Sequence, residues 1–310
     1  MAKSLKGHQN IAYWRDQFIK SLGHEGKSLN TLKNYKTDLD VFIKYLAGKT
    51  AESYDLGGFG LEQVKEYGGH LDVIYTSDNS KRRRVQTLRK FFDYLLLQEL
   101  VTGNPVRKLP TSPKKLDPPK PNPHHEVMKL WNYLKNQADD ELNLDTVMAK
   151  RNLVIVMLIY GSALKVSDLE KLKRPHIGKT RVTVNHPKRD PYSVPLCACF
   201  HEYYDDYLSS LKTFLSGSGK RIDHVLFNAN AHAVISGKLT ARGIELLFEE
   251  WSKQLDFEMT AKSLRQASVT NWVNQAHKDN LIKEWMGVAP SYSLKMYRDI
   301  SENFQYKELS

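Results

Sequence analysis

Four parts of the chain carry basic side chains of the kind that bind phosphate groups. They comprise a run at 81–84 followed by Arg89 and Lys90, an isolated Lys165, the pair Lys188 and Arg189, and the pair Lys262 and Arg265. Any of these charges can attract a phosphate. Arginine also donates two parallel hydrogen bonds to two phosphate oxygens, whereas lysine places one charge on a flexible stem. The residue types therefore indicate a phosphate-bearing partner.

The distribution of charge favours the same kind of partner. The chain has 46 Lys and Arg against 35 Asp and Glu, a net charge of +11. Residues 1–120 hold 21 of the basic and 13 of the acidic side chains, so the first third is expected to bind phosphate more strongly. The candidate DNA contacts are Lys81, Arg82, Arg83, Arg84, Arg89 and Arg189. No acidic residue follows the 81–84 run at helical spacing, which favours a phosphate-facing role over a merely solvated face.

Several classes of protein fit the sequence poorly. The longest apolar stretch, 153–159, is far below the ~20 residues that cross a bilayer, and the first 15 residues lack an apolar signal segment. We therefore expect a cytoplasmic, nucleoid-associated protein that does not bind membranes. Cys197 and Cys199 are too few for a disulfide framework or a four-ligand zinc site. They are interpreted as ordinary thiols, and neither a metal nor a cofactor is expected.

The first third of the chain has helical periodicity. An apolar stripe runs through Leu32, Leu39 and Leu46, and a second lies within 85–96, where Asp78 or Ser80 could cap the helix. A tract rich in Pro and Lys then follows, and it should be extended because Pro lacks an amide donor and disfavours helix before it. The sequence thus predicts an all-helical domain at 1–105, a linker at 106–123 and a second domain at 124–310.

The second domain mixes the two periodicities. Short β segments at 181–184 and 192–196 flank a basic turn, which predicts an antiparallel hairpin. Helices are expected around 127–138, 150–162, 244–251 and 263–276, with Thr240 and Thr260 as caps for the last two. The predicted fold class is mainly α with a small antiparallel β-sheet, an all-α domain followed by an α+β domain.

The order of these elements resembles the tyrosine recombinases of the Xer and phage-integrase type over roughly residues 28–300. Residues 31–39 are similar to the family's opening core-binding helix, and 83–97 followed by Gly103-Asn104-Pro105 are similar to its last one. Residues 158–169 resemble the G-x-x-x-R-x-S-E-L segment of the family's first catalytic arginine, with Lys165 in its place. The family's catalytic lysine lies in the hairpin, where Lys188 is the candidate.

Two further boxes complete the resemblance. Residues 260–266 resemble the H-x-x-R box, with Arg265 retained and Lys262 where the histidine stands. Residues 286–290 resemble L-G-H-x-S, with Val288 at the histidine position. Tyr297 follows nine residues later, the interval at which the family places its nucleophile.

The resemblance implies a metal-free reaction in which Tyr297 attacks a DNA phosphate and forms a 3′-phosphotyrosyl link. Lys165 cannot hold two phosphate oxygens as arginine does, and loss of one such donor costs on the order of 10² to 10³ in rate. Lys262 is a poor base at neutral pH, and Val288 has no proton to exchange. We therefore predict that phosphate binding survives and that cleavage is weak or absent.

Three functions remain open. One is a non-catalytic module, architectural or regulatory, that clamps double-stranded DNA between two domains. The second is a divergent but active recombinase that uses Tyr297. The third is an interaction protein whose tail, 301–310, docks on a neighbouring copy in a homo-oligomer.

Single residues keep plainer alternatives too. Tyr297 could be a packed side chain, Arg265 a salt-bridge partner and Lys188 a solvated turn residue. Arg151 or Arg174 could compensate for Lys165, and Trp251, Trp272 and Trp285 are interpreted as packing residues.

Overall fold

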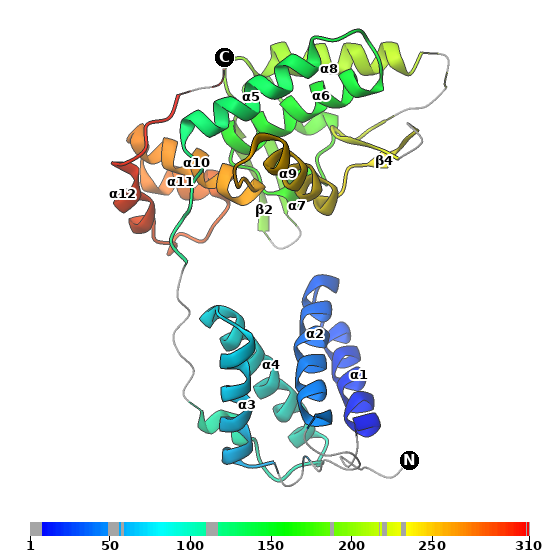
Figure 1. Ribbon diagram of the computed structural model, residues 1–310, viewed down its shortest axis with the longest axis vertical. Helices are drawn as coiled ribbons and strands as arrows, with labels where there is room; N and C mark the ends of the chain where they lie inside the picture. Colours follow the sequence, from blue (N-terminus) through cyan, green and yellow to red (C-terminus); the bar gives the residue numbers. More distant parts are fainter. Residues whose placement is uncertain are drawn as a thin grey trace. The chain divides into compact units, whose positions relative to one another are not determined.

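The chain folds into two compact units, residues 1–117 and 118–310, each with its own hydrophobic core (Figure 1). The computed structural model describes residues 8–48, 56, 59–109, 117–186, 189–216, 218, 222–230, 234–307 and 309. Most of the secondary structure is helical, and two small antiparallel sheets lie in the second unit. The predicted fold class, mainly α with a small antiparallel sheet, is confirmed.

The described residues of the first unit form four α-helices. They are α1 (His8–His24), α2 (Leu29–Ala47), α3 (Leu61–Ile74) and α4 (Asp78–Leu97). The predicted stripe of α2 is buried at Leu39, Phe42 and Leu46, because residues at this spacing share one helix face. The cap of α4 is Ser77, not Asp78 or Ser80: its backbone is extended and its hydroxyl accepts from the N–H of Ser80. Asp78 already belongs to the first helical turn.

The structure describes the Pro-rich tract up to Leu109 and again from Asp117. A 3₁₀ turn, η2 (Pro105–Lys108), buries Val106 in the first core, and the side chain of Asn104 caps this turn. Pro105 suits its first position because its fixed φ fits a helical turn. In the second unit Asn122 is buried and donates to the carbonyl oxygen of Glu258. The extended conformation predicted for 106–123 therefore does not hold at 106–108.

The second unit contains eight α-helices among its described residues. They are α5 (His124–Ala138), α6 (Leu144–Val156), α7 (Val166–Leu169), α8 (Phe200–Phe214), α9 (Ala241–Leu255), α10 (Ala261–Asn274) and α11 (Asp279–Met286), with the short α12 (Lys295–Ser301) after them as an eighth near the chain's end. Helices α5, α6 and α8 pack side by side (Figure 1). Thr240 and Thr260 cap α9 and α10 as predicted.

A hairpin formed by β1 (Arg181–His186) and β2 (Arg189–Pro195) confirms the predicted β segments. Val182 pairs with Val194, and both are fully buried against the core. The sequence did not predict the second ribbon, β3 (Phe227–Ala229) with β4 (Ile235–Lys238). Strands this short offer too few positions for a period of two to be visible.

A wide turn joins α6 to α7. The apolar stretch of α6 continues into a π-helical turn, η3 (Met157–Gly161), and two residues later Ala163 adopts a left-handed backbone with φ +46°. The 3₁₀ turn η4 (Arg174–His176) follows α7. Left-handed backbone is uncommon for residues other than glycine, and it frequently marks a functional site.

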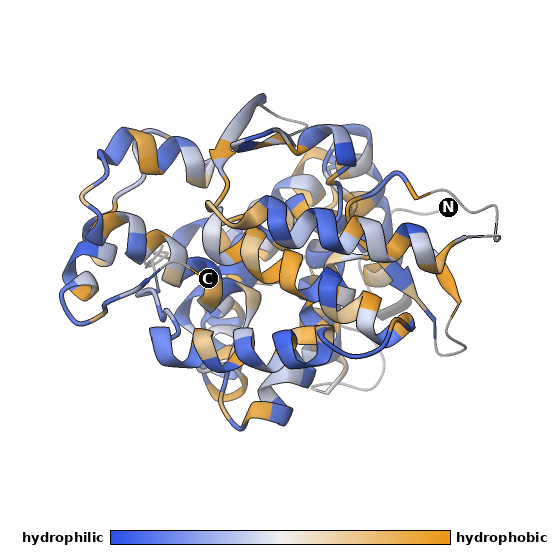
Figure 2. Cartoon of the chain, turned by 90° about the horizontal axis from the view of Figure 1, so that it is seen from above, coloured by the Kyte–Doolittle hydropathy of each residue, from blue (hydrophilic) through white to orange (hydrophobic). Residues whose placement is uncertain are grey.

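Hydrophilic and hydrophobic residues lie next to one another along most helices (Figure 2). This is the pattern of helices that bury one face and expose the other. Within the described ranges, no helix combines the length and the apolar character needed to span a membrane.

Candidate active site

Arg265 lies in the first turns of α10 and is held by main-chain groups of two other segments. Its Nε donates to the carbonyl oxygen of Ala163 at 2.5 Å, and its Nη2 donates to the carbonyl oxygen of Met286 at 3.0 Å. Burial lowers its pKa, and the nearby hydroxyl of Tyr297 is the largest opposing influence. The guanidinium thus joins the η3–α7 turn, α10 and the end of α11.

Tyr297 lies in the first turn of α12 and is buried, with 4% of its surface exposed. Burial raises the pKa of its hydroxyl, and a hydrogen bond with Tyr292 raises it further, while Arg265 lowers it. Arg265 and Tyr297, which the sequence matched to separate family boxes, are therefore neighbours in the folded unit.

Two backbone features shape this neighbourhood. The left-handed Ala163 directs its carbonyl oxygen to Arg265. Gly287 ends α11 with φ +57°, a conformation that glycine adopts without steric cost. Asp168 also lies near Arg265 and accepts from the main-chain N–H of Lys165 at 3.3 Å.

Lys165, Lys262 and Arg265 line one cavity of about 450 Å³. Lys165 is half-buried at the start of α7, and Lys262 is exposed in the first turn of α10. Three candidate residues thus line the same cavity, which is large enough to hold a phosphate group and the sugar next to it.

The structure also shows the surroundings of Val288, which stands at a histidine position of the family pattern, and of Gln266 beside the H-x-x-R box. Val288 is half-buried and packs against the core, so it presents only methyl groups to its surroundings. Gln266, one residue after Arg265, accepts from the main-chain N–H of Lys120 at 3.0 Å. Lys188 lies outside the described residues, and Arg189 is described only by its backbone, which pairs with His186.

Neither proposed substitute for Lys165 lines the cavity. Arg151 is buried in the core, where it donates to the carbonyl oxygen of Phe227 and to the side chain of Asn152. Burial lowers the pKa of Arg151 to about 10. Arg174 is exposed on η4, close to Tyr204.

Three of the four basic residues at 81–84 pair with acids of the first unit. Arg83 pairs with the buried Asp38 of α2 at 2.8 Å, and Arg84 is buried beside Asp38 with its guanidinium over the ring of Tyr75. Burial raises the pKa of Asp38 even though both arginines lower it. Residue spacing along α4 does not reveal Asp38 as the partner of these two arginines, and a contact of the run with DNA stays a prediction.

The remaining basic residues of α4 make further contacts. Lys81 pairs with Asp72 and Asp78, and Nη2 of Arg89 donates to the carbonyl oxygens of Val106 and Leu109. Arg82 is half-buried. The exposed part of this run is smaller than the sequence suggests, with Arg83 the most accessible of the four residues at 81–84.

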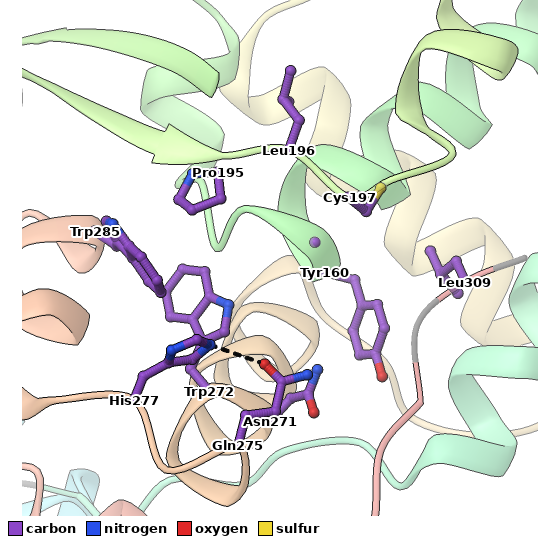
Figure 3. A pocket seen from close by; sticks show the side chains of 11 residues that line it. Tyr160, Pro195, Leu196, Cys197, Asn271, Trp272, Gln275, His277, Trp285 and Leu309 are labelled. Carbon is purple, nitrogen blue, oxygen red and sulfur yellow. Dashed lines mark hydrogen bonds between the residues drawn. The ribbon is translucent and has the colours of Figure 1, made fainter. Parts of the chain in front are cut away.

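The tryptophans pack as the sequence predicted. Trp251 is buried, and the rings of Trp272 and Trp285 meet edge to face at 5.1 Å. His277 lies against Trp285 and forms a hydrogen bond with Gln275 (Figure 3). Trp272, Trp285 and His277 line a small cavity of about 160 Å³. Gln275, Cys197 and Leu309 line it as well.

The carboxy-terminal tail packs on its own unit. The hydroxyl of Tyr160 donates to the carbonyl oxygen of Lys307, that of Tyr306 donates to Asn122, and the thiol of Cys199 donates to Leu309. Leu309 is 4% exposed. Cys197 and Cys199 are half-buried thiols, as expected.

Sequence reasoning missed Ala163, Tyr292 and Asp168 as parts of the site. Ala163 acts through its main chain, which carries no residue-type signal. Asp168 stands within the matched box 158–169, and Tyr292 lies between the 286–290 box and Tyr297, so their positions could have drawn attention to them. Within the described residues, no group of three side chains is arranged to bind a metal ion.

Comparisons with known proteins agree with this arrangement. Residues 16–99 match the family "Phage integrase, N-terminal SAM-like domain". The chain is 24% identical over 277 residues to tyrosine recombinase XerC of Vibrio vulnificus, covering 88% of this chain and 82% of that protein. It is 23% identical over 305 residues to XerC of Anoxybacillus flavithermus, covering 95% of each.

Solved structures share the fold. A lambda integrase dimer bound to a COC′ core site superposes with a TM-score of 0.67 at 16% identity, covering 99% of this chain and 81% of that one. The Tn1549 transposon integrase in complex with circular intermediate DNA gives 0.62 at 11% identity, covering 97% and 96%. Together with the matched boxes and the Arg265–Tyr297 neighbourhood, these findings show that the chain has the fold of these integrases and is similar in sequence to tyrosine recombinases over most of its length.

Proposed function

We propose that this protein binds double-stranded DNA through both units and that its ability to cleave DNA is impaired or lost. The observation that carries the proposal is the cavity at which Lys165, Lys262 and Arg265 meet. These cations can neutralise phosphates of a duplex, and such contacts supply most of the affinity of a protein for DNA. The linker would let the two units bind different faces of the duplex, so that the protein clamps the DNA. Its role would then be architectural or regulatory, in the nucleoid.

The surroundings of Tyr297 support impaired cleavage. Attack on phosphorus requires the phenol to lose its proton, and both burial and Tyr292 raise the pKa of this hydroxyl. Val288 offers no base, because its side chain has no group that exchanges a proton. Two N–H groups of Arg265 are already committed to main-chain carbonyls.

A covalent-capture experiment tests this proposal. DNA fragments that bind the protein are first selected from genomic DNA, and duplexes of the selected sequence are then nicked so that a cleaved end diffuses away. We expect retention of the duplex at low salt and no covalent adduct. A protein–DNA adduct that Tyr297→Phe abolishes and Tyr292→Phe retains would overturn the proposal that DNA cleavage is impaired.

A divergent, active recombinase is the second candidate. The proximity of Arg265 and Tyr297 favours it, since this pair unites a phosphate-binding guanidinium with a nucleophile. Its relatives are named tyrosine recombinases, and lambda integrase forms a tetramer bound to a Holliday junction. Assembly on DNA as a homo-oligomer is part of both candidates, and the sedimentation of protein–duplex complexes measures it.

The third candidate, a protein that works by docking its tail on another copy, has less support. The tail makes its hydrogen bonds within its own unit at Tyr160, Cys199 and Asn122. Stable self-association together with no retention of duplex at low salt would favour this candidate.

A further inference from the structure

The cavity that holds Lys165, Lys262 and Arg265 is also lined by a fourth cation, Arg242 of α9. Two carboxylates, Glu245 and Glu249 of the same helix, line it as well. Thr240 fixes the start of α9, because its hydroxyl accepts from the N–H of Gly243 at 3.0 Å. Arg242 is thus presented by the first turn of a well-capped helix.

Arg242 is held by the two carboxylates in a forked arrangement. Its Nη1 donates to Oε1 of Glu249 at 2.8 Å, and its Nη2 donates to Oε2 of the same residue at 3.4 Å. A weaker contact of 3.4 Å joins Nη1 to Glu245. A carboxylate presents two oxygens to a guanidinium much as a phosphate does.

These contacts are exchangeable. The side chain of Arg242 is 61% exposed and those of Glu245 and Glu249 are 51% and 53% exposed. Exposed ion pairs of this kind contribute only about 0–1 kcal/mol. The guanidinium of Arg265, in contrast, is tied to two buried carbonyl oxygens. Lys165 and Lys262 offer single ammonium charges.

We propose that Arg242 is a DNA-phosphate contact of this cavity and that Glu249 occupies its guanidinium until DNA arrives. The side chain turns from Glu249 to two oxygens of one phosphate and supplies the forked contact that Lys165 cannot make. Glu249 then faces the phosphate with its charge no longer covered, so its presence weakens DNA binding. This inference rests on the proposed binding of duplex DNA.

The test uses the full chain and a fluorescent DNA duplex, with affinity measured by anisotropy over a series of salt concentrations. Arg242→Ala is compared with Lys253→Ala, which removes the same charge from α9 but does not line the cavity. Loss of a charged, forked contact should weaken binding by about tenfold. It should also reduce the slope of log affinity against log salt by about 0.9. Arg242→Lys should keep the slope and lose part of the affinity.

A second matched pair tests the role of Glu249. Glu249→Gln and Glu250→Gln each remove one negative charge from neighbouring exposed positions of α9, and of these two residues Glu249 is the one that pairs with Arg242. We expect Glu249→Gln to strengthen binding more than Glu250→Gln. Circular dichroism and urea unfolding of each variant confirm that the comparison is made between folded proteins.

The outcomes separate the two proposals. If the wild-type chain does not retain the duplex at low salt, the proposed function fails. If the wild type binds and Arg242→Ala matches Lys253→Ala in affinity and salt slope, the assignment of Arg242 is overturned. If Glu249→Gln matches Glu250→Gln, the part assigned to Glu249 is wrong.

Discussion

The guanidinium of Arg265 donates from Nε to the carbonyl oxygen of Ala163, a residue whose backbone is left-handed with φ +46°. A residue with a Cβ adopts this conformation at a cost of roughly 1–2 kcal/mol. The surrounding fold therefore maintains a strained main-chain position that orients the most strongly held cation of the candidate site.

Replacing Ala163 with glycine should relieve this strain. We expect Ala163→Gly to raise the free energy of unfolding by up to about 1 kcal/mol, since glycine accepts positive φ without a steric cost. Ala149→Gly, in the interior of α6, should lower it by about 1 kcal/mol or more. Urea unfolding of both variants measures the effect, and shifts of the same sign would contradict the argument.

Arg265→Ala should be costly for both stability and DNA binding. The substitution leaves the carbonyl oxygens of Ala163 and Met286 without their donor, and such losses cost about 1–3 kcal/mol each. Arg265→Lys should be intermediate, since one ammonium cannot reproduce the geometry of two separate donors. Unfolding and anisotropy measurements are compared, and unchanged stability in Arg265→Ala would show that these bonds contribute little.

The pH dependence of stability should report the burial of Tyr297. Its pKa is raised above the ordinary value of 10.0, so the folded state holds this proton more tightly than the unfolded state does. The stabilisation is complete below about pH 10 and is lost as pH rises above that value. Burial also raises the pKa of Tyr207, so Tyr297→Phe should make the alkaline decline shallower without abolishing it. Urea unfolding from neutral to alkaline pH tests this, and superimposable curves would contradict it.

Asp38 should matter far more than Asp40, although both lie on α2. Removing Asp38 leaves Arg84 buried without its acid, and breaking a buried pair typically costs about 3–5 kcal/mol. Asp40 is half exposed and pairs with Arg15, so Asp40→Ala should change stability by about 0–1 kcal/mol. If the two substitutions lowered the free energy of unfolding equally, the pairing of Asp38 with Arg83 and Arg84 would not be a structural role of the 81–84 run.

Cleavage should improve when the missing family groups are restored together. The triple variant Lys165→Arg, Lys262→His and Val288→His returns a forked donor and two proton-exchanging groups to the neighbourhood of Tyr297. Single donors of this kind are worth on the order of 10² to 10³ in rate, and grouped residues are not additive. Covalent capture on the nicked duplex measures the gain, with Tyr297→Phe added to the triple variant as the control.

The sequence by itself determined the helices, the hairpin, and the order of Lys165, Arg265 and Tyr297 along the family boxes. These features depend on spacing between near neighbours, and apolar periodicity and capping residues report such spacing directly. The stripe of α2 and the caps Thr240 and Thr260 are examples.

Only the tertiary structure decided which partner each charge takes. Asp38 neutralises Arg83 and Arg84 from another helix, Ala163 and Met286 hold Arg265 through their main chains, and Arg242 joins the cavity from α9. These pairings connect segments far apart in the chain, and main-chain carbonyls carry no mark of residue type. They follow from how the helices pack, which the spacing of residues within one helix does not specify.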